Sequence, residues 1–193
     1  MRVACLCLVT AAMIAGCASP RASFYRLSAD PSLTAMTAQP PARTIIVGPV
    51  TVPDLVDRPQ IVTRNTNNEV ALNEYARWGE PLKSSIADAL AGDLTLLLGS
   101  DRVAVASRAI ADTDALRVRV DIQQFESVTG ESVLIDARWT MRGISDGAGV
   151  SGRSLVREPV SGPDYDALVA AQSRALAHVS RDIAAAIVGT AGP

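Results

Sequence analysis

Two stretches in the second half of the chain alternate between apolar and polar side chains. A period of two predicts strands with one buried face and one wet face, and Thr129-Gly130 between the stretches predicts a hairpin. The alternation breaks between Ile122 and Phe125, which predicts a β-bulge near Gln123-Gln124. The apolar positions are Leu116, Val118, Val120 and Ile122 in the first stretch and Val133, Ile135, Ala137, Trp139 and Met141 in the second.

Two other stretches repeat with the helical period. The first helix is predicted after Pro81, which suits the first helical position, and Gly99 is predicted to stop it. The second helix is predicted over 164–188, between Pro163 and Gly189. The apolar stripes are Leu82, Ile86, Ala89, Leu90 and Leu97 on the first helix and Tyr165, Leu168, Val169, Leu176, Val179, Ile183 and Ile187 on the second.

Short apolar and β-branched runs predict further strands. In the run at 44–53, Pro49 lacks an N–H group, so the second half of the run is predicted to lie at a sheet edge or in a bulge. The run Asn65 to Asn68 predicts a hairpin turn, because asparagine tolerates positive φ. Since strands, a helix, strands and a helix follow one another, we predict an α+β fold, a mostly antiparallel sheet with two helices packed on one face. The short runs lie at 44–53, 61–64, 70–72, 103–105 and 154–156.

The N-terminus has the layout of an export signal. Arg2 precedes an almost unbroken apolar or small run from Val3 to Ala15, which is shorter than the about 20 residues of a membrane-spanning helix. We therefore predict a signal peptide at 1–16 and an exported chain. The tetrapeptide Ile14-Ala15-Gly16-Cys17 resembles the bacterial lipobox, whose cysteine is lipidated and becomes the first residue of the mature protein. The alternative is an ordinary signal peptide that is cleaved elsewhere.

The lipobox resemblance also implies a location and an anchor. Ala18 rather than an aspartate follows Cys17, which by similarity to lipoprotein sorting favours the outer membrane, facing the periplasm. Cys17 then carries acyl chains such as palmitate. We predict a lipidated tether at 17–42, rich in Ala, Ser, Pro and Thr, and a single domain at 43–193. Two aromatics in a polar tether have no reason to be exposed, so we predict that Phe24 to Leu27 docks on the domain as a short strand or plug.

Composition excludes several kinds of chemistry. The chain has 193 residues, 18 basic and 20 acidic side chains and a net charge of −2, with no basic run, so a nucleic-acid partner is not expected. All three cysteines, Cys5, Cys7 and Cys17, lie in the first 17 residues, which excludes disulfides, zinc knuckles and cysteine nucleophiles from the domain. A lone histidine, His178, cannot build a multi-histidine metal site. We predict no metal and no cofactor besides the covalent lipid on Cys17.

Few polar side chains lie at positions that suggest a catalytic or ligand-binding site. His178 lies opposite the apolar stripe of its helix, which indicates a solvated histidine rather than a base or a ligand. Asp93 and Gln172 lie on apolar stripes, where a hydrogen-bonded core residue is favoured over a polar site. Asp121 and Arg138 are predicted to face each other across the hairpin. The sequence contains no catalytic constellation, so an enzyme is not predicted.

Two segments are unusual in so small a domain. Residues 52–64 place charges and two prolines beside apolar residues, and residues 73–82 place Tyr75 and Trp78 just before a helix. One interpretation is an ordered connector with both aromatics packed under it. Fixing such loops in one conformation costs free energy, which favours a partner-binding surface over a mere connector.

Five motifs in this order resemble those of the ABC-type transport auxiliary lipoproteins, the PqiC-like family. The resemblance implies a lipoprotein partner of a mammalian-cell-entry (MCE) protein, in an ABC-type system that moves lipid or other hydrophobic molecules between membranes. The chain contains no Walker motif, so it does not itself power transport. The motifs are the lipobox at Cys17, Phe24 to Leu27, Gly48 to Pro53, Asp57 to Arg64 and Arg77 to Leu82.

The resemblance leads to a docking hypothesis. Lipid on Cys17 holds the domain on a membrane, the tether sets its reach, and two surface segments contact the MCE protein. Two alternatives stay open: carriage of a lipid in an apolar pocket between sheet and helices, and a purely structural envelope lipoprotein. The sequence also leaves open the cargo and whether the chain forms a homo-oligomer. The predicted partner-binding residues are Asp57, Arg58, Pro59, Gln60, Arg64, Tyr75, Arg77 and Trp78.

Overall fold

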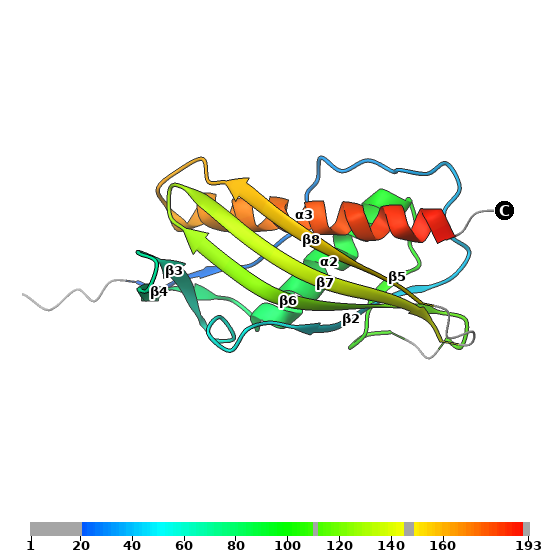
Figure 1. Ribbon diagram of the computed structural model, residues 1–193, viewed down its shortest axis with the longest axis horizontal. Helices are drawn as coiled ribbons and strands as arrows, with labels where there is room; N and C mark the ends of the chain where they lie inside the picture. Colours follow the sequence, from blue (N-terminus) through cyan, green and yellow to red (C-terminus); the bar gives the residue numbers. More distant parts are fainter. Residues whose placement is uncertain (1–20, 110–111, 145–148, 191–193) are drawn as a thin grey trace, which may run out of the picture.

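A five-stranded sheet forms one layer of the protein and two helices form the other (Figure 1). The computed structural model describes residues 21–109, 112–144 and 149–190. The strand order is β5-β2-β6-β7-β8, and both helices cover the same face, so the predicted α+β fold is confirmed. The elements are β2 Ile45–Thr51, α2 Leu82–Leu98, β5 Val103–Val105, β6 Leu116–Val128, β7 Ser132–Gly143, β8 Gly149–Pro159 and α3 Tyr165–Thr190.

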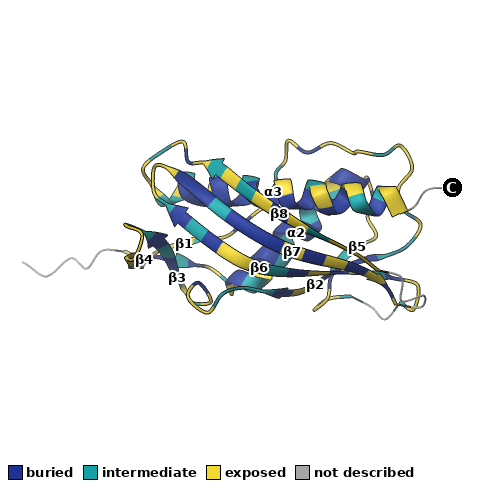
Figure 2. Cartoon of the chain, viewed as in Figure 1, coloured by how far each residue is buried: buried dark blue, intermediate teal, exposed yellow. Residues whose placement is uncertain are grey.

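Strands β6, β7 and β8 form the antiparallel part of this sheet. The predicted hairpin of β6 and β7 is confirmed, and its register shifts between Ile122 and Gln124, where the bulge is predicted. Asp121 lies opposite Arg138, also as predicted. Along most of β6 and the second half of β7, alternate residues are buried under the helices, while the positions between them are exposed or half-buried on the other face (Figure 2).

Strand β2 makes the sheet mixed rather than purely antiparallel. It pairs in parallel with both β5 and β6. The parallel arrangement with β5 follows from α2, because a helical crossover brings the chain back to the end from which it started. Beyond the Gly48-Pro49 bond, β2 pairs with β6 alone, and the register shifts between Val47 and Val50. The predicted edge or bulge at Pro49 is therefore confirmed.

Both helices bury an apolar stripe against the sheet. α2 starts after Pro81 and ends at Gly99, whose φ of 57° is left-handed and therefore suits glycine. α3 continues through Gly189 to Thr190, so the predicted stop at Gly189 is wrong: this glycine does not take the left-handed conformation that ends a helix. The buried side chains of the predicted α3 stripe are Leu168, Val169, Leu176, Val179, Ile183 and Ile187.

A second sheet of three strands, the small sheet, lies at the end of the molecule where the N-terminal trace enters (Figure 1). Its order is β1 (Ser23–Tyr25), β4 (Val70–Trp78) and β3 (Gln60–Arg64). β3 and β4 form the predicted hairpin, but no described residue other than glycine has a positive φ. The turn is closed instead by the Glu69 carbonyl, which accepts hydrogen bonds from the N–H groups of Asn65 at 2.9 Å and Thr66 at 3.3 Å.

Strand β1 belongs to a segment that connects the small sheet to the helices. β1 pairs in parallel with β4, as a short strand of the kind predicted. Tyr25 packs against the core but Phe24 is 67% exposed, because neighbouring residues of a strand point to opposite faces. The expectation that both aromatics are covered is therefore wrong. Leu27 and Leu33 are buried, and the Leu27 N–H donates a hydrogen bond to Ser85 Oγ of α2 at 3.0 Å.

Trp139 shows how closely β7, β8 and α3 pack. Its ring lies over Gly152, its partner on β8, and its Nε1 donates a hydrogen bond to Ser154 Oγ at 3.1 Å. The Ser154 hydroxyl in turn donates to Asp182 of α3 at 2.6 Å. A Cβ atom added at Gly152 would lie 2.1 Å from the Trp139 ring, so this position has room for glycine alone.

The substitution Gly152→Ala is expected to lower the free energy of unfolding by about 1–3 kcal/mol, the usual cost of overpacking. Urea denaturation followed by tryptophan fluorescence measures the change. The control is Gly189→Ala on α3, where an added Cβ meets no atom within 4 Å and a gain of about 0.5–1 kcal/mol is expected. Equal stability of the Gly152→Ala variant and the wild type would contradict the close approach of the ring.

Candidate partner-binding surface

The fold brings the two predicted partner-binding segments together on the small sheet. Gln60 of β3 pairs with Arg77 of β4, and the Trp78 N–H donates a hydrogen bond to the Pro59 carbonyl at 2.7 Å. Residues 57–60 therefore lie beside residues 75–78, although the hairpin separates them in the sequence. Arg64 stands at the far end of β3 and ion-pairs with Glu126 of β6 at 3.2 Å.

An irregularity in β4 decides which of its aromatics is accessible. The register jumps from Gln60 opposite Arg77 to Ile61 opposite Asn73, so β4 carries extra residues at this point. The Asn73 side-chain oxygen accepts hydrogen bonds from the N–H groups of Tyr75 at 2.8 Å and Ala76 at 3.1 Å, which fixes the irregular backbone. Asn73 Nδ2 also donates to the Tyr165 hydroxyl of α3 at 3.1 Å. The small sheet is thereby fastened to the helical layer.

Tyr75 is 49% exposed, whereas Trp78 is 6% exposed and belongs to the core. The connector interpretation, with both aromatics packed beneath it, therefore fits Trp78 and fails for Tyr75. Since a buried ring does not contact a partner in this conformation, the structure gives Trp78 a place in the core and leaves Tyr75 available on the surface.

The charged members of the predicted set make contacts within the chain. Asp57 ion-pairs with Lys83 in the first turn of α2 at 2.6 Å, and Gln60 Nε2 donates to the Glu74 carboxylate at 3.2 Å. Asp57 and Pro59 are exposed, while Arg58, Gln60, Arg64 and Arg77 are half-buried. These contacts hold the loop in one shape and leave its outer side open to a partner.

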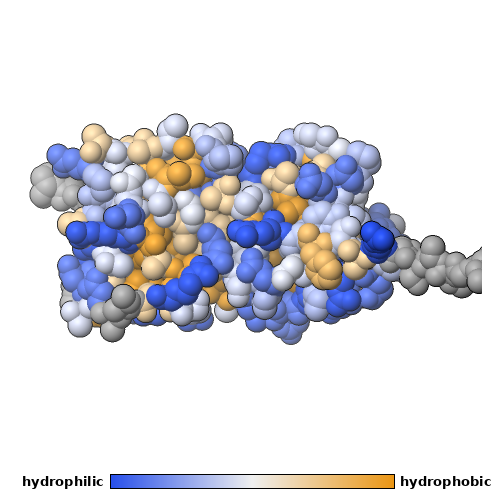
Figure 3. Space-filling view, turned by 180° about the vertical axis from the view of Figure 1, so that it is seen from behind, coloured by the Kyte–Doolittle hydropathy of each residue, from blue (hydrophilic) through white to orange (hydrophobic). Residues whose placement is uncertain are grey.

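Sequence reasoning missed Phe24 as a surface residue. Phe24 pairs with Arg77 on the outer side of the small sheet, two positions from Tyr75 along β4. Leu55 and Leu72 are also exposed in this part of the chain, and hydrophobic atoms show on the back of the molecule near the N-terminal trace (Figure 3). The signal that could have found Phe24 is the alternation of β1 itself, because Tyr25 and Leu27 both face inward. We call Phe24, Tyr75 and the 57–60 loop the partner surface.

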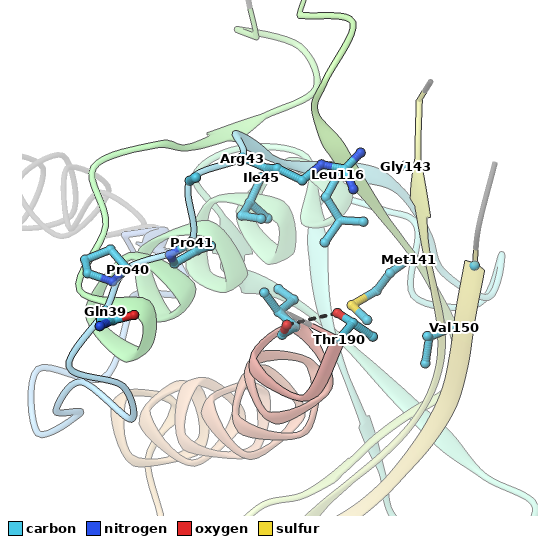
Figure 4. A pocket seen from close by; sticks show the side chains of 13 residues that line it. Gln39, Pro40, Pro41, Arg43, Ile45, Leu116, Met141, Gly143, Val150 and Thr190 are labelled. Atoms are coloured by element: carbon cyan, nitrogen blue, oxygen red, sulfur yellow. Dashed lines mark hydrogen bonds between the residues drawn. The ribbon is translucent and has the colours of Figure 1, made fainter. Parts of the chain in front are cut away.

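A pocket of about 510 Å³ opens at the other end of the large sheet, between the last turn of α3 and the ends of β7 and β8 (Figure 4). Its lining is largely apolar, which suits the alternative of lipid carriage; that alternative stays a prediction. The lining includes Pro40, Pro41, Ile45, Leu116, Met141, Val150 and Ile187.

Asp93 and Gln172 are hydrogen-bonded core residues, as predicted. The Asp93 carboxylate accepts hydrogen bonds from the Asp30 N–H and the Ser180 hydroxyl, both at 2.9 Å, and so joins α2, the N-terminal segment and α3. Burial raises the pKa of Asp93 to about 6, although both hydrogen bonds act in the opposite direction. Gln172 Nε2 donates to Ser127 Oγ of β6 at 2.9 Å.

His178 and Cys17 are the remaining residues that the sequence singled out. His178 is exposed, as predicted, with its Nε2 3.8 Å from Glu158 and its Nδ1 3.4 Å from Nη1 of Arg181. Within residues 21–109, 112–144 and 149–190, no group of three His, Cys, Asp or Glu side chains is arranged to hold a metal ion. Cys17 lies outside the described residues, and its lipidation stays a prediction.

The free energy of unfolding is expected to fall by on the order of 3 kcal/mol between about pH 4 and pH 6 because of Asp93. Its pKa is about 6 in the folded protein against an ordinary 3.8, so the folded state binds the extra proton and loses that advantage as the pH rises through 6. Urea denaturation at a series of pH values from 4 to 8 measures this change in the free energy of unfolding. Asp93→Asn mimics the protonated carboxyl and should lack this decline; an equal decline in both proteins would contradict the assignment.

Comparisons with known proteins bear on the chain as a whole. A family model of the ABC-type transport auxiliary lipoprotein component matches residues 25–184. No curated protein matches the chain. A crystal structure of an uncharacterized protein is similar with a TM-score of 0.69 and 20% identity, over 87% of this chain and 99% of that one. A DUF330 protein from Xanthomonas campestris is similar with a TM-score of 0.64 and 23% identity, over 83% of this chain and 92% of that one. These two likenesses show the fold.

Proposed function

The chain belongs to the ABC-type transport auxiliary lipoprotein component family, and from this membership we propose that it docks an MCE-type transport system at the outer membrane. Membership makes the chain an auxiliary envelope component of a transport system. The MCE partner, the outer membrane and the docking role are the proposed part. The observation that carries the proposal is the family match over residues 25–184, which covers most of the described chain. We propose no catalytic role.

Lipid on Cys17 is the proposed attachment. No helix in the described part of the chain is long and apolar enough to span a bilayer. Arg21, the first described residue, follows Cys17 by four residues, which reach at most about 14 Å when fully extended. Two or more acyl chains hold a protein stably on a membrane. Attachment at Cys17 would therefore keep the small sheet close to the lipid headgroups.

The partner surface is the proposed contact with the transport system. Phe24 and Tyr75 are exposed aromatics on the same side of the small sheet, and aromatic side chains supply much of the binding energy at protein interfaces. The loop at 57–60 lies beside the end of β4 and adds polar groups that its own ion pair and hydrogen bond hold in place. A preformed loop loses little conformational entropy when a partner binds.

Capture of a purified MCE protein from the same organism tests the docking role. The double substitution Phe24→Ala and Tyr75→Ala is expected to weaken capture at least about tenfold, since two exposed aromatic contacts are lost. Both side chains are exposed, so the fold should persist. The control is Met36→Ala, which removes a hydrophobic side chain of comparable exposure, 48%, outside the partner surface. Undiminished capture by the folded double variant would count against this surface.

Cell fractionation tests the anchor. Cys17→Ser is expected to move the chain out of the membrane fraction, because the acyl chains are no longer attached. Cys5→Ser and Cys7→Ser are matched controls that leave the lipobox cysteine in place and should stay membrane-bound. Density-gradient separation then assigns the wild type to the outer or the inner membrane. Retention of the Cys17→Ser variant in the membrane fraction would exclude lipid at this residue as the anchor.

A further inference from the structure

Figure 2 shows the face of the large sheet that the helices leave uncovered, and the strand registers place many arginines on this face. Six arginines on β6, β7 and β8 point to this face, against three carboxylates. This face therefore has a balance of three positive charges in a chain whose net charge is −2. The arginines are Arg117, Arg119, Arg138, Arg142, Arg153 and Arg157, and the carboxylates are Asp121, Glu126 and Asp136.

Three of the six arginines gather where β6 begins and β7 ends; we call Arg117, Arg119 and Arg142 the distal arginine cluster, whereas Arg138 lies further along the sheet, opposite Asp121. All three are exposed. Arg117 lies directly opposite Arg142 in the antiparallel pair, and like charges at such positions destabilise a sheet. Gly149 is the β8 partner of Arg142, and a Cβ there would lie 3.1 Å from Arg142 Cγ, so a glycine leaves room for this side chain.

The protein itself does little to neutralise this cluster. Its three side chains form no hydrogen bond or ion pair with any residue among 21–109, 112–144 and 149–190. By contrast, Arg153 makes a double hydrogen bond to Asp136 at 2.8 and 2.7 Å. Asp121, the carboxylate nearest the cluster in the pairing, accepts hydrogen bonds from Thr51 and Gln123. The guanidinium groups of the cluster are therefore available to an external anion.

The position of the cluster favours a protein over a membrane as its partner. The small sheet reaches β6 at Glu126, through the ion pair with Arg64. Arg117 lies nine residues earlier on β6, about 30 Å away at the rise of a strand, towards the end opposite the N-terminal trace (Figure 1). With lipid on Cys17, this end of the sheet would be the end farther from the anchor.

We propose that the distal arginine cluster is a second docking surface, which binds an acidic segment of the transport partner. The proposal rests on the proposed function, because it assumes that the chain docks a transport component. Planar guanidinium groups bind carboxylates through paired hydrogen bonds. Complementary charge also speeds encounter and fixes the orientation of two proteins. The partner surface and the cluster, at opposite ends of the molecule, would then set the orientation of the partner relative to the membrane.

Photocrosslinking in cells that contain the full chain and its transport system tests the proposal. Thr140 lies on the same face, opposite Arg119, so Thr140→p-benzoylphenylalanine places a crosslinker inside the cluster. The expected product, identified by mass spectrometry, joins Thr140 to a peptide of the transport component with at least about four acidic residues in ten. Arg117→Glu with Arg142→Glu should lower the yield at least about tenfold. The charge-matched control, Arg102→Glu with Arg108→Glu, exchanges two exposed arginines elsewhere and should leave the yield within about twofold.

Several outcomes would overturn the proposal. Crosslinks from Thr140 to a second copy of the chain, to lipid, or to a segment without acidic residues would assign the cluster another role. A parallel experiment with Tyr75→p-benzoylphenylalanine separates this inference from the proposed function. Capture of the transport component from Tyr75 but not from Thr140 would refute the cluster alone. Absence of the transport component from both positions would refute the docking function as well.

Discussion

The burial of one face of the five-stranded sheet under α2 and α3 is the constraint on which the rest of the structure depends. Because strand side chains alternate, each residue of β6 and β7 that enters the core places its neighbours on the open face. The apolar stripes of both helices are covered there and by the contact between the two helices. This arrangement leaves a wide sheet surface with no helix over it. That surface carries the arginines, which make it positively charged in a chain whose net charge is −2.

The length of β6 and β7 separates the molecule into two ends with different surfaces. At one end the small sheet presents Phe24 and Tyr75, near the start of the described chain at Arg21. At the other end lie the distal arginine cluster and an apolar pocket. If the lipid on Cys17 and the contacts at both ends are as proposed, the molecule would act as a spacer between a membrane and the transport system rather than as a freely diffusing carrier.

The N-terminal segment from Arg21 to Leu33 is fastened to the core. It contributes β1 to the small sheet, buries Leu27 and Leu33, and meets α2 and α3 at the Asp93 carboxylate. A buried carboxylate costs stability when it ionises, yet this one is held by hydrogen bonds from two separate elements. A pull at the N-terminal end of this segment would therefore act on the helical layer.

Local pattern was sufficient for the elements formed by sequence neighbours. The β6–β7 hairpin, its bulge, the start of α2 at Pro81 and its end at Gly99 all follow from period and backbone preference, which neighbouring residues decide. The same information failed at Gly189, because a glycine stops a helix only when it takes the left-handed conformation.

The candidate surfaces depended on contacts between residues distant in sequence. An aromatic residue in a strand gives the same sequence pattern whether its side chain faces the core or the solvent. The sequence therefore could not distinguish Trp78, which is buried, from Tyr75 and Phe24, which are exposed. The pairing of Gln60 with Arg77 and of Arg117 with Arg142 likewise exists only once the strands are in register. The sequence by itself determined the family, the elements and the predicted anchor, since these depend on local motifs. The tertiary structure alone decided which side chains share a surface, because register and burial are properties of the packed chain.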